Sequence, residues 1–304
     1  MNVQRRDFLK VAAASAAAAT TLPSLAAEEK TPVVVVVHGK DLVKMLNLGI
    51  EKLGGWGQFF KKGMKVAIKP NVAWYSTPEQ GANTAPELIR ECVLQAEKAG
   101  ASKIDIPENP CSPEGKAFPQ SGALKAIEGT SAKLFRPDHK KGYRKTEIPK
   151  GKICKSAEIT NELLDADCLI NMPVAKHHGG ATLSLSMKNW MGAISNASRR
   201  SWHRDGLHQC IADFATFLKP TLTIIDASRT MLNRGPQGPG DLAYPNELIL
   251  SLDPVAADAY AATLFVDKVK AVKTPFDIGY IKIAHEMGVG CGDLSKVKIE
   301  RIEC

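Results

Sequence analysis

The side chains of this chain that could do chemistry gather where lysine and histidine follow a predicted buried strand. The stretch begins at Asn171, turns at Pro173 and then brings Lys176, His177 and His178 into a Gly-rich segment that we expect to be a loop. Adjacent histidines on a loop can both reach one site, whereas on a strand they would face opposite sides. We therefore predict a site at this turn. The alternative is a surface histidine pair that caps nearby carbonyl groups.

Four of the seven histidines lie between positions 177 and 208. His203 is expected just before a helix that starts near Asp205, with His208 in its first turn. Neutral imidazole is the most common protein ligand of transition metals, and several imidazoles with a carboxylate would suit iron, zinc or nickel. We predict one transition metal, with iron favoured, although the spacing matches no named metal motif. The predicted ligands are His177, His178, His203, His208 and Asp226.

The lysines of the same region could bind an anion. Lys69 and Asn71 follow an earlier predicted strand, and Lys188 and Asn189 follow the histidine pair. A lysine in such a pocket acts as a general base only if burial and neighbouring cations lower its pKa. The predicted catalytic residues are Lys69, Lys176 and Lys188. The predicted substrate-binding residues, for a small anion such as a carboxylate or phosphate, are Asn71, Asn171, Asn189 and Arg200.

The elements that must position these residues alternate between strand and helix. Residues 33–38 form a continuous β-branched run, which is typical of a strand buried on both faces. Thr84 and Pro86 mark the start of a predicted helix that ends at Gly100. The alternation predicts an α/β fold of three layers, with a mostly parallel sheet and helices on both faces. In such sheets ligands bind beyond the carboxyl ends of the strands.

The other predicted elements follow the same alternation. Further strands are predicted at 65–69, 103–106, 134–135, 168–172, 222–226, 248–252 and 297–302. Further helices are predicted at 41–53, 121–128, 156–166, 205–218, 254–266 and 276–287. Two stretches rich in Gly and Pro, 107–122 and 233–245, are predicted to be irregular.

The first residues of the chain predict export. Arg5-Arg6-Asp7-Phe8-Leu9-Lys10 is similar to the twin-arginine export motif, and an Ala-rich apolar run and a small-residue cleavage pattern follow it. We therefore predict a signal peptide at 1–27, a single α/β domain at 28–304, and a periplasmic or otherwise exported protein. The twin-arginine translocation machinery is the predicted partner. That machinery moves folded cargo, which often carries a metal or redox cofactor loaded in the cytoplasm.

Composition excludes several other classes. The net charge of +8 is spread out, apart from a basic cluster at 140–155 with few aromatic residues, so a nucleic-acid surface is not predicted. Outside the leader there is no apolar run of about 18 residues, so we predict no membrane span. The seven cysteines lie far apart with no CxxC pair. This spacing argues against an iron–sulfur cluster.

Several of these motifs together resemble the domain-of-unknown-function family numbered 362. The motifs are Lys69-Pro70-Asn71, the run Asn171…Pro173…Lys176…His178, Lys188-Asn189…Gly192, and Asp226…Gly235-Pro236…Gly238. The resemblance covers about residues 33–300. Many members are fused to ferredoxin-type modules, which implies redox or metal association. This chain lacks the cluster-type cysteine run and should be the core domain alone. The family supplies no established reaction.

Two functional hypotheses follow. The first is an exported metal-binding or redox-associated protein that acts as an enzyme on a small anionic substrate in a His/Lys-lined crevice. The second is a non-catalytic metal- or anion-binding protein, or an accessory subunit of an exported redox complex with a redox partner protein. A third interpretation assigns these histidines and lysines to structural roles alone.

Overall fold

The first strand, β1 (Val33–His38), shows how the protein divides into layers. In the computed structural model, which describes residues 31–304, Val34 and Val36 pack into one hydrophobic core, and Val35 and Val37 pack into another. Successive side chains of a strand point to opposite faces of the sheet. A strand that is buried on both faces therefore needs a helical layer on each side, which is the three-layer α/β fold predicted from the sequence.

The main sheet is mostly parallel. Its strands lie in the order β13-β1-β12-β10-β7-β2-β3-β4, and β12 runs antiparallel to both of its neighbours, whereas the other pairs on this path are parallel. Besides β1, the strands on this path are β2 (Lys65–Pro70), β3 (Lys103–Pro107), β4 (Lys133–Phe135), β7 (Cys168–Met172), β10 (Leu222–Met231), β12 (Glu247–Ser251) and β13 (Lys298–Glu303).

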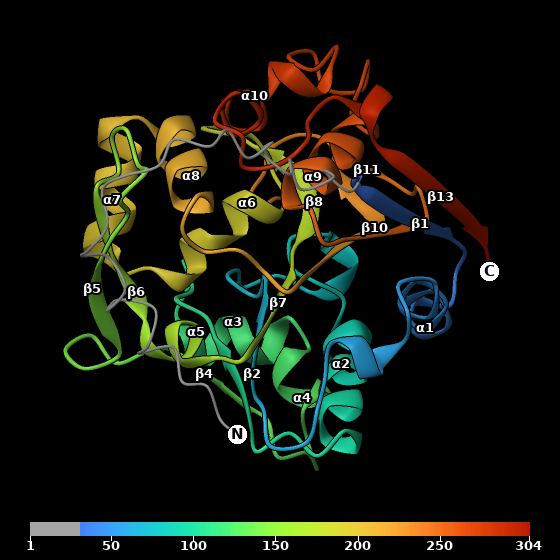
Figure 1. Ribbon diagram of the computed structural model, residues 1–304, viewed down its shortest axis with the longest axis vertical. Helices are drawn as coiled ribbons and strands as arrows, with labels where there is room; N and C mark the ends of the chain where they lie inside the picture. The colour runs from blue at the N-terminus through green and yellow to red at the C-terminus, as the bar shows by residue number, and fades with distance from the viewer. Residues whose placement is uncertain (1–30) are drawn as a thin grey trace, which may run out of the picture. The chain divides into compact units, whose positions relative to one another are not determined.

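Helices cover both faces of the sheet (Figure 1). The core on one face is closed by α1 (Leu42–Lys52), α2 (Pro86–Lys98), α3 (Glu114–Gln120) and α4 (Ala123–Ala126). The core on the other face is closed by α6 (Ser186–Asn189), α8 (Leu207–Ala215), α9 (Pro254–Thr263) and α10 (Gly279–Glu286). Local sequence sets two of the helix starts: Asp41 caps α1 and Asp253 caps α9, each by accepting from backbone N–H groups.

Smaller elements surround the sheet. They are the strands β5 (Tyr143–Glu147), β6 (Ser156–Thr160), β8 (Val174–His178), β9 (Thr182–Ser184) and β11 (Leu242–Ala243), the helices α5 (Asn161–Asp165) and α7 (Asn196–Asp205), and the 3-10 turns η2 (Trp56–Gln58), η3 (Pro78–Gln80), η4 (Trp190–Ala193), η5 (Pro275–Asp277) and η6 (Leu294–Lys296). β5 and β6 form a separate two-stranded sheet, whereas β8 extends the main sheet by pairing with β10 and β9.

The structure corrects four local predictions. Lys176, His177 and His178 lie on β8 and not on a loop, because β8 pairs with β9 across a tight turn at Gly179 and Gly180. The helix predicted at 156–166 is divided into β6 and α5. The stretch 107–122 contains α3, and His203 lies inside α7.

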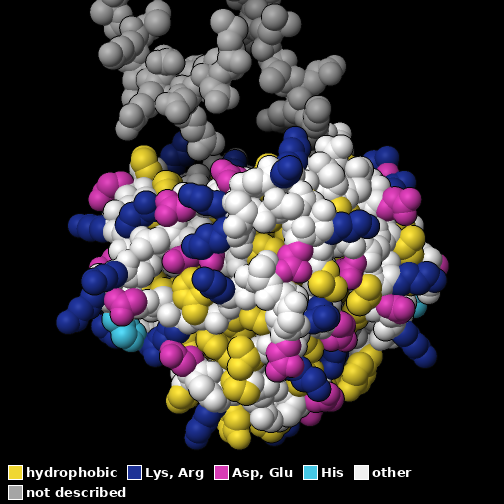
Figure 2. Space-filling view, turned by 90° about the horizontal axis from the view of Figure 1, so that it is seen from below, with side chains coloured by type: hydrophobic (Ala, Val, Ile, Leu, Met, Phe, Trp, Pro, Cys, Tyr) yellow, Lys and Arg dark blue, Asp and Glu magenta, His cyan; other side chains and the backbone are white. Residues whose placement is uncertain are grey.

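Residues 31–304 form one compact unit, and the predicted signal peptide, 1–27, lies outside the described residues. None of the helices in the described part of the chain combines the length and apolar character that crossing a bilayer requires. On the face seen in Figure 2, Lys and Arg side chains lie interspersed with Asp and Glu. Positive charge on that face is thus locally balanced.

Candidate functional site

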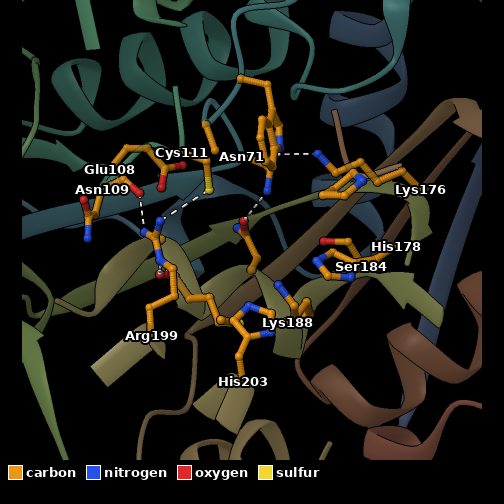
Figure 3. Close-up of a pocket in the computed structure, with 16 residues that line it drawn as sticks. Asn71, Glu108, Asn109, Cys111, Lys176, His178, Ser184, Lys188, Arg199 and His203 are labelled. Carbon is orange, nitrogen blue, oxygen red and sulfur yellow. Dashed lines mark hydrogen bonds between the residues drawn. The ribbon is translucent and has the colours of Figure 1, made fainter. Parts of the chain in front are cut away.

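A pocket of about 130 Å³ lies where several predicted site residues meet. Asn71 follows the end of β2, and Glu108, Asn109 and Cys111 follow the end of β3, so the pocket lies beyond the carboxyl ends of parallel strands. The cationic and imidazole side chains in its lining, from β8, α6 and α7, are Lys176, His178, Lys188, Arg199 and His203 (Figure 3).

Lys69 forms a buried ion pair at the base of the site. Its Nζ lies 2.8 Å from Glu108 Oε2, and both side chains are almost fully buried. Burial lowers the pKa of Lys69, and the Glu108 carboxylate opposes that shift only in part. The other carboxylate oxygen, Glu108 Oε1, is buried and has no hydrogen-bond partner in the part of the chain that the structure describes. A Cβ on Gly192 would lie 1.9 Å from that oxygen, so this arrangement needs glycine there.

Three asparagines form a chain of amide hydrogen bonds above the sheet. Asn71 Nδ2 donates to Asn189 Oδ1 at 3.1 Å, Asn189 Nδ2 donates to Asn171 Oδ1 at 2.8 Å, and Asn171 Nδ2 donates to Ser186 O at 2.8 Å. This chain fixes the Asn71 amide so that its oxygen faces Lys176. Of these predicted substrate-binding residues, Asn71 and Asn189 line the pocket, whereas Asn171 holds Asn189 in place from beneath.

Within residues 31–304, Lys176 has no acidic partner. It is fully buried, and its Nζ donates to Asn71 Oδ1 at 2.8 Å and to the Ala82 carbonyl. Burial, and then the nearby charge of Lys188, lower the pKa of Lys176 to about 7. A lysine with this pKa exchanges protons near neutral pH, which is the condition under which it can act as a general base.

The Lys188 amine has fewer contacts than that of Lys176. Its side chain is 8% exposed, and it makes no hydrogen bond or ion pair to any residue in the described range. Burial, and then the nearby Arg199 and Lys69, lower the pKa of Lys188 to about 8. Figure 3 shows it beside His178 and His203. An unpaired amine that lines a pocket is well suited to hold an anion.

His178 faces the pocket as a hydrogen-bond donor. Its Nδ1 accepts from the backbone N–H groups of Gly180, at 3.0 Å, and Ala181, at 3.1 Å. Burial, and then Lys188 and Lys176, lower the pKa of His178 to about 2, so the ring is neutral. A neutral imidazole whose Nδ1 accepts carries its proton on Nε2. In this tautomer the Nε2 lone pair is not free to bind a metal.

The other predicted metal ligands are dispersed. His203 joins the pocket, with its ring stacked on that of His178 at 6.4 Å between centroids. His177 faces the other way on β8, where its Nδ1 accepts from Gly235 N at 3.1 Å, and His208 Nδ1 accepts from Tyr280 N at 3.2 Å. Asp226 accepts from Ala85 N at 2.9 Å and from Ser228. Residues 31–304 contain no group of three or more His, Cys, Asp or Glu side chains arranged to hold a metal ion.

The pocket residues that the sequence prediction left out include Arg199, Glu108 and Cys111. Arg199 lines the pocket, whereas the predicted Arg200 is exposed on the next position of α7. The Arg199 guanidinium donates to Asn109 O and, at 3.3 Å, to Cys111 Sγ. Glu108 lies in the stretch 107–122, which was predicted to be irregular, and it was not among the predicted site residues. A signal was available, because β3, like β2, ends at a proline that is soon followed by an asparagine, here Asn109.

Comparison with protein families identifies the chain. A model described as a domain of unknown function, DUF362, matches residues 66–263, so the chain belongs to that family, as its motifs predicted. A model of the twin-arginine translocation signal matches residues 2–21. The chain is therefore exported by the twin-arginine route, and this prediction is confirmed.

Two individual proteins are similar to this chain. The thylakoid-associated protein sll1697 of Synechocystis is 24% identical over 224 residues, which cover 71% of this chain and 68% of that protein. The lactate racemase apoprotein of Thermoanaerobacterium thermosaccharolyticum is 14% identical with a TM-score of 0.42. That match covers 66% of this chain and spans half the length of the racemase chain.

Proposed function

We propose that this exported DUF362 protein binds a small organic anion in the pocket and uses Lys176 to exchange a proton with it. One observation carries the proposal: Lys176, Lys188 and Arg199 converge on a single cavity in which the Glu108 carboxylate is already paired with Lys69. Such an uncompensated cluster of buried cations is costly without a counter-ion. A bound carboxylate or phosphate would supply the missing negative charge.

The size and chemistry of the pocket limit the ligand. At about 130 Å³ the cavity is smaller than the roughly 300–1,000 Å³ typical of sites for drug-sized molecules. Its polar lining consists largely of donors: the two lysines, the guanidinium and the His178 Nε2–H. A ligand with several acceptor oxygens close together matches this lining. Lys176, which is protonated when the anion binds, would then pass a proton to the bound molecule and take it back, which would make the protein an enzyme and not only a carrier.

Anion binding can be tested by titration calorimetry at pH 6.5 with acetate, oxalate and inorganic phosphate. We expect at least one of the three to bind. Lys188→Met should weaken that binding about tenfold or more, because it removes a charged donor worth about 1.5–3 kcal/mol. Lys44→Met, an exposed lysine on α1, is the matched control and should bind as the unchanged protein does. If none of the anions binds, the proposal is wrong.

Metal binding is the second candidate, because His178 and His203 share one wall of the pocket with their rings stacked. A metal there would require His178 to give up its two backbone N–H bonds and move its proton from Nε2 to Nδ1. Metal content measured by mass spectrometry on protein folded in its native host tests this candidate. Near-stoichiometric iron, zinc or nickel that disappears in a His178→Ala/His203→Ala variant would favour it over the anion. The redox association and the accessory-subunit role stay predictions.

A further inference from the structure

Cys111 lies at the pocket beside the cations that would hold an anion. It is exposed, unlike Cys92, Cys154, Cys168 and Cys210, which are buried. Its backbone N–H donates to Ala73 O at 3.0 Å, which fixes this part of the loop after β3. Its Sγ accepts from Arg199 Nη1 at 3.3 Å (Figure 3). Reactive cysteines occur in partly exposed, electropositive surroundings of this kind.

One observation independent of the cysteine points to an anion at the same place. Lys188, which is more than nine-tenths buried, lines the pocket without a partner of its own in the described residues. A ligand carboxylate on Lys188 and Arg199 would leave the rest of the molecule beside Cys111 Sγ, because Arg199 contacts that sulfur.

We propose that Cys111 is a nucleophile of this pocket, and that the ligands it attacks are small carboxylates that carry an electrophilic carbon. This inference rests on the proposed anion site. In the step, the sulfur forms a bond to that carbon, and the carbon's leaving group departs with its bonding electron pair. The thiol proton leaves to solvent, which reaches the exposed Cys111. The cations act by binding the carboxylate next to the sulfur and so raising its local concentration.

Iodoacetate and iodoacetamide provide the test, since they carry the same electrophilic carbon and differ in charge. Alkylation forms the sulfur–carbon bond and releases iodide. In an ordinary thiol the neutral reagent reacts faster. At Cys111 we expect the ratio of the iodoacetate rate to the iodoacetamide rate to exceed that at Cys304 by about tenfold or more. The rate with iodoacetate should also saturate. Cys291 and Cys304, which are half-buried, are internal references in the same reduced sample, read by peptide mass spectrometry.

Variants make the result specific. Lys188→Met should abolish the excess at Cys111 while leaving Cys304 unchanged, and Lys44→Met should change neither. Equal rate ratios at Cys111 and Cys304 would overturn the nucleophile proposal. Calorimetry on Cys111→Ser tests the anion site without the thiol. If oxalate or another of the three anions binds to this variant, while Cys111 of the unchanged protein shows no preference for iodoacetate, only the nucleophile proposal is wrong. If no anion binds, the proposed function fails as well.

Discussion

At the scale of single residues, the lysines at the pocket differ in whether a carboxylate balances their charge. Lys69 is compensated by Glu108, whereas Lys176 and Lys188 have no carboxylate partner among the described residues. Burial, together with nearby cations, lowers the pKa of Lys176 to about 7 and that of Lys188 to about 8. Both amines therefore begin to lose their protons near neutral pH in the free protein. A bound anion reverses this tendency, because it favours the charged forms.

Anion affinity should consequently fall as pH rises. Below pH 7 both lysines are protonated and attract the ligand, whereas above pH 8 both are largely neutral in the free protein. For a carboxylate that stays ionised throughout, we expect affinity to fall by about tenfold per pH unit for each lysine that must take up a proton. Calorimetry at pH 7.5 in two buffers of different ionisation enthalpy should show net proton uptake on binding.

Lys176→Met is the control for that titration. Since it removes the group with the lower pKa, the onset of the affinity loss should move from about pH 7 towards about pH 8. An affinity that is constant from pH 6 to pH 9 would contradict the assignment of the lysines to the anion site.

At the scale of elements, the sequence predicted the strands and helices that hydrophobic patterning marks, and it missed a strand that depends on pairing with a neighbouring strand. The β-branched run of β1 and the strand–helix alternation predicted the layers, because burial on two faces leaves a direct mark on composition. Lys176 and His178 were placed on a loop, since three consecutive polar side chains, at positions 176–178, end β8 before two glycines and look irregular without the partner strand β9. Arg199 and Arg200 differ only in rotation about α7, which sequence alone did not settle.

One carboxylate holds the short helix that carries Lys188 and Asn189. Asp258 on α9 accepts from Ser186 N at 2.7 Å and from Met187 N at 3.0 Å, so it satisfies the first N–H groups of α6. Asp258→Ala would leave both groups unpaired in the core, at about 1–3 kcal/mol each. We expect a loss of several kcal/mol in the free energy of unfolding, measured by urea denaturation, and weaker anion binding.

Two further variants serve as comparisons for the stability loss of Asp258→Ala. Asp258→Asn retains one carbonyl oxygen and should lose less stability than Asp258→Ala. Asp165→Ala, which breaks an exposed ion pair with Arg144, should cost only about 0–1 kcal/mol. If Asp258→Ala were as stable as Asp165→Ala, α6 would have to be held by other contacts.

At the scale of the whole molecule, export and the pocket are linked through folding. The twin-arginine route carries folded proteins, and the pocket joins segments on either side of β7, from Asn71 to Pro236, so it exists only once the sheet has formed. Lys replacement of both Arg5 and Arg6 should leave the full-length, folded precursor in the cytoplasm of a bacterial host, as judged by fractionation and immunoblotting. Arg200→Lys/Arg204→Lys, which changes two exposed arginines of α7, should be exported and have its signal peptide removed normally.

The folding of α6 provides a second test of export. Lys188→Met should be exported, because Lys188 has no hydrogen-bond or ion-pair partner among the described residues, whereas Asp258→Ala should accumulate as precursor. Equal export of these two variants would mean that the folding of α6 is not monitored before translocation.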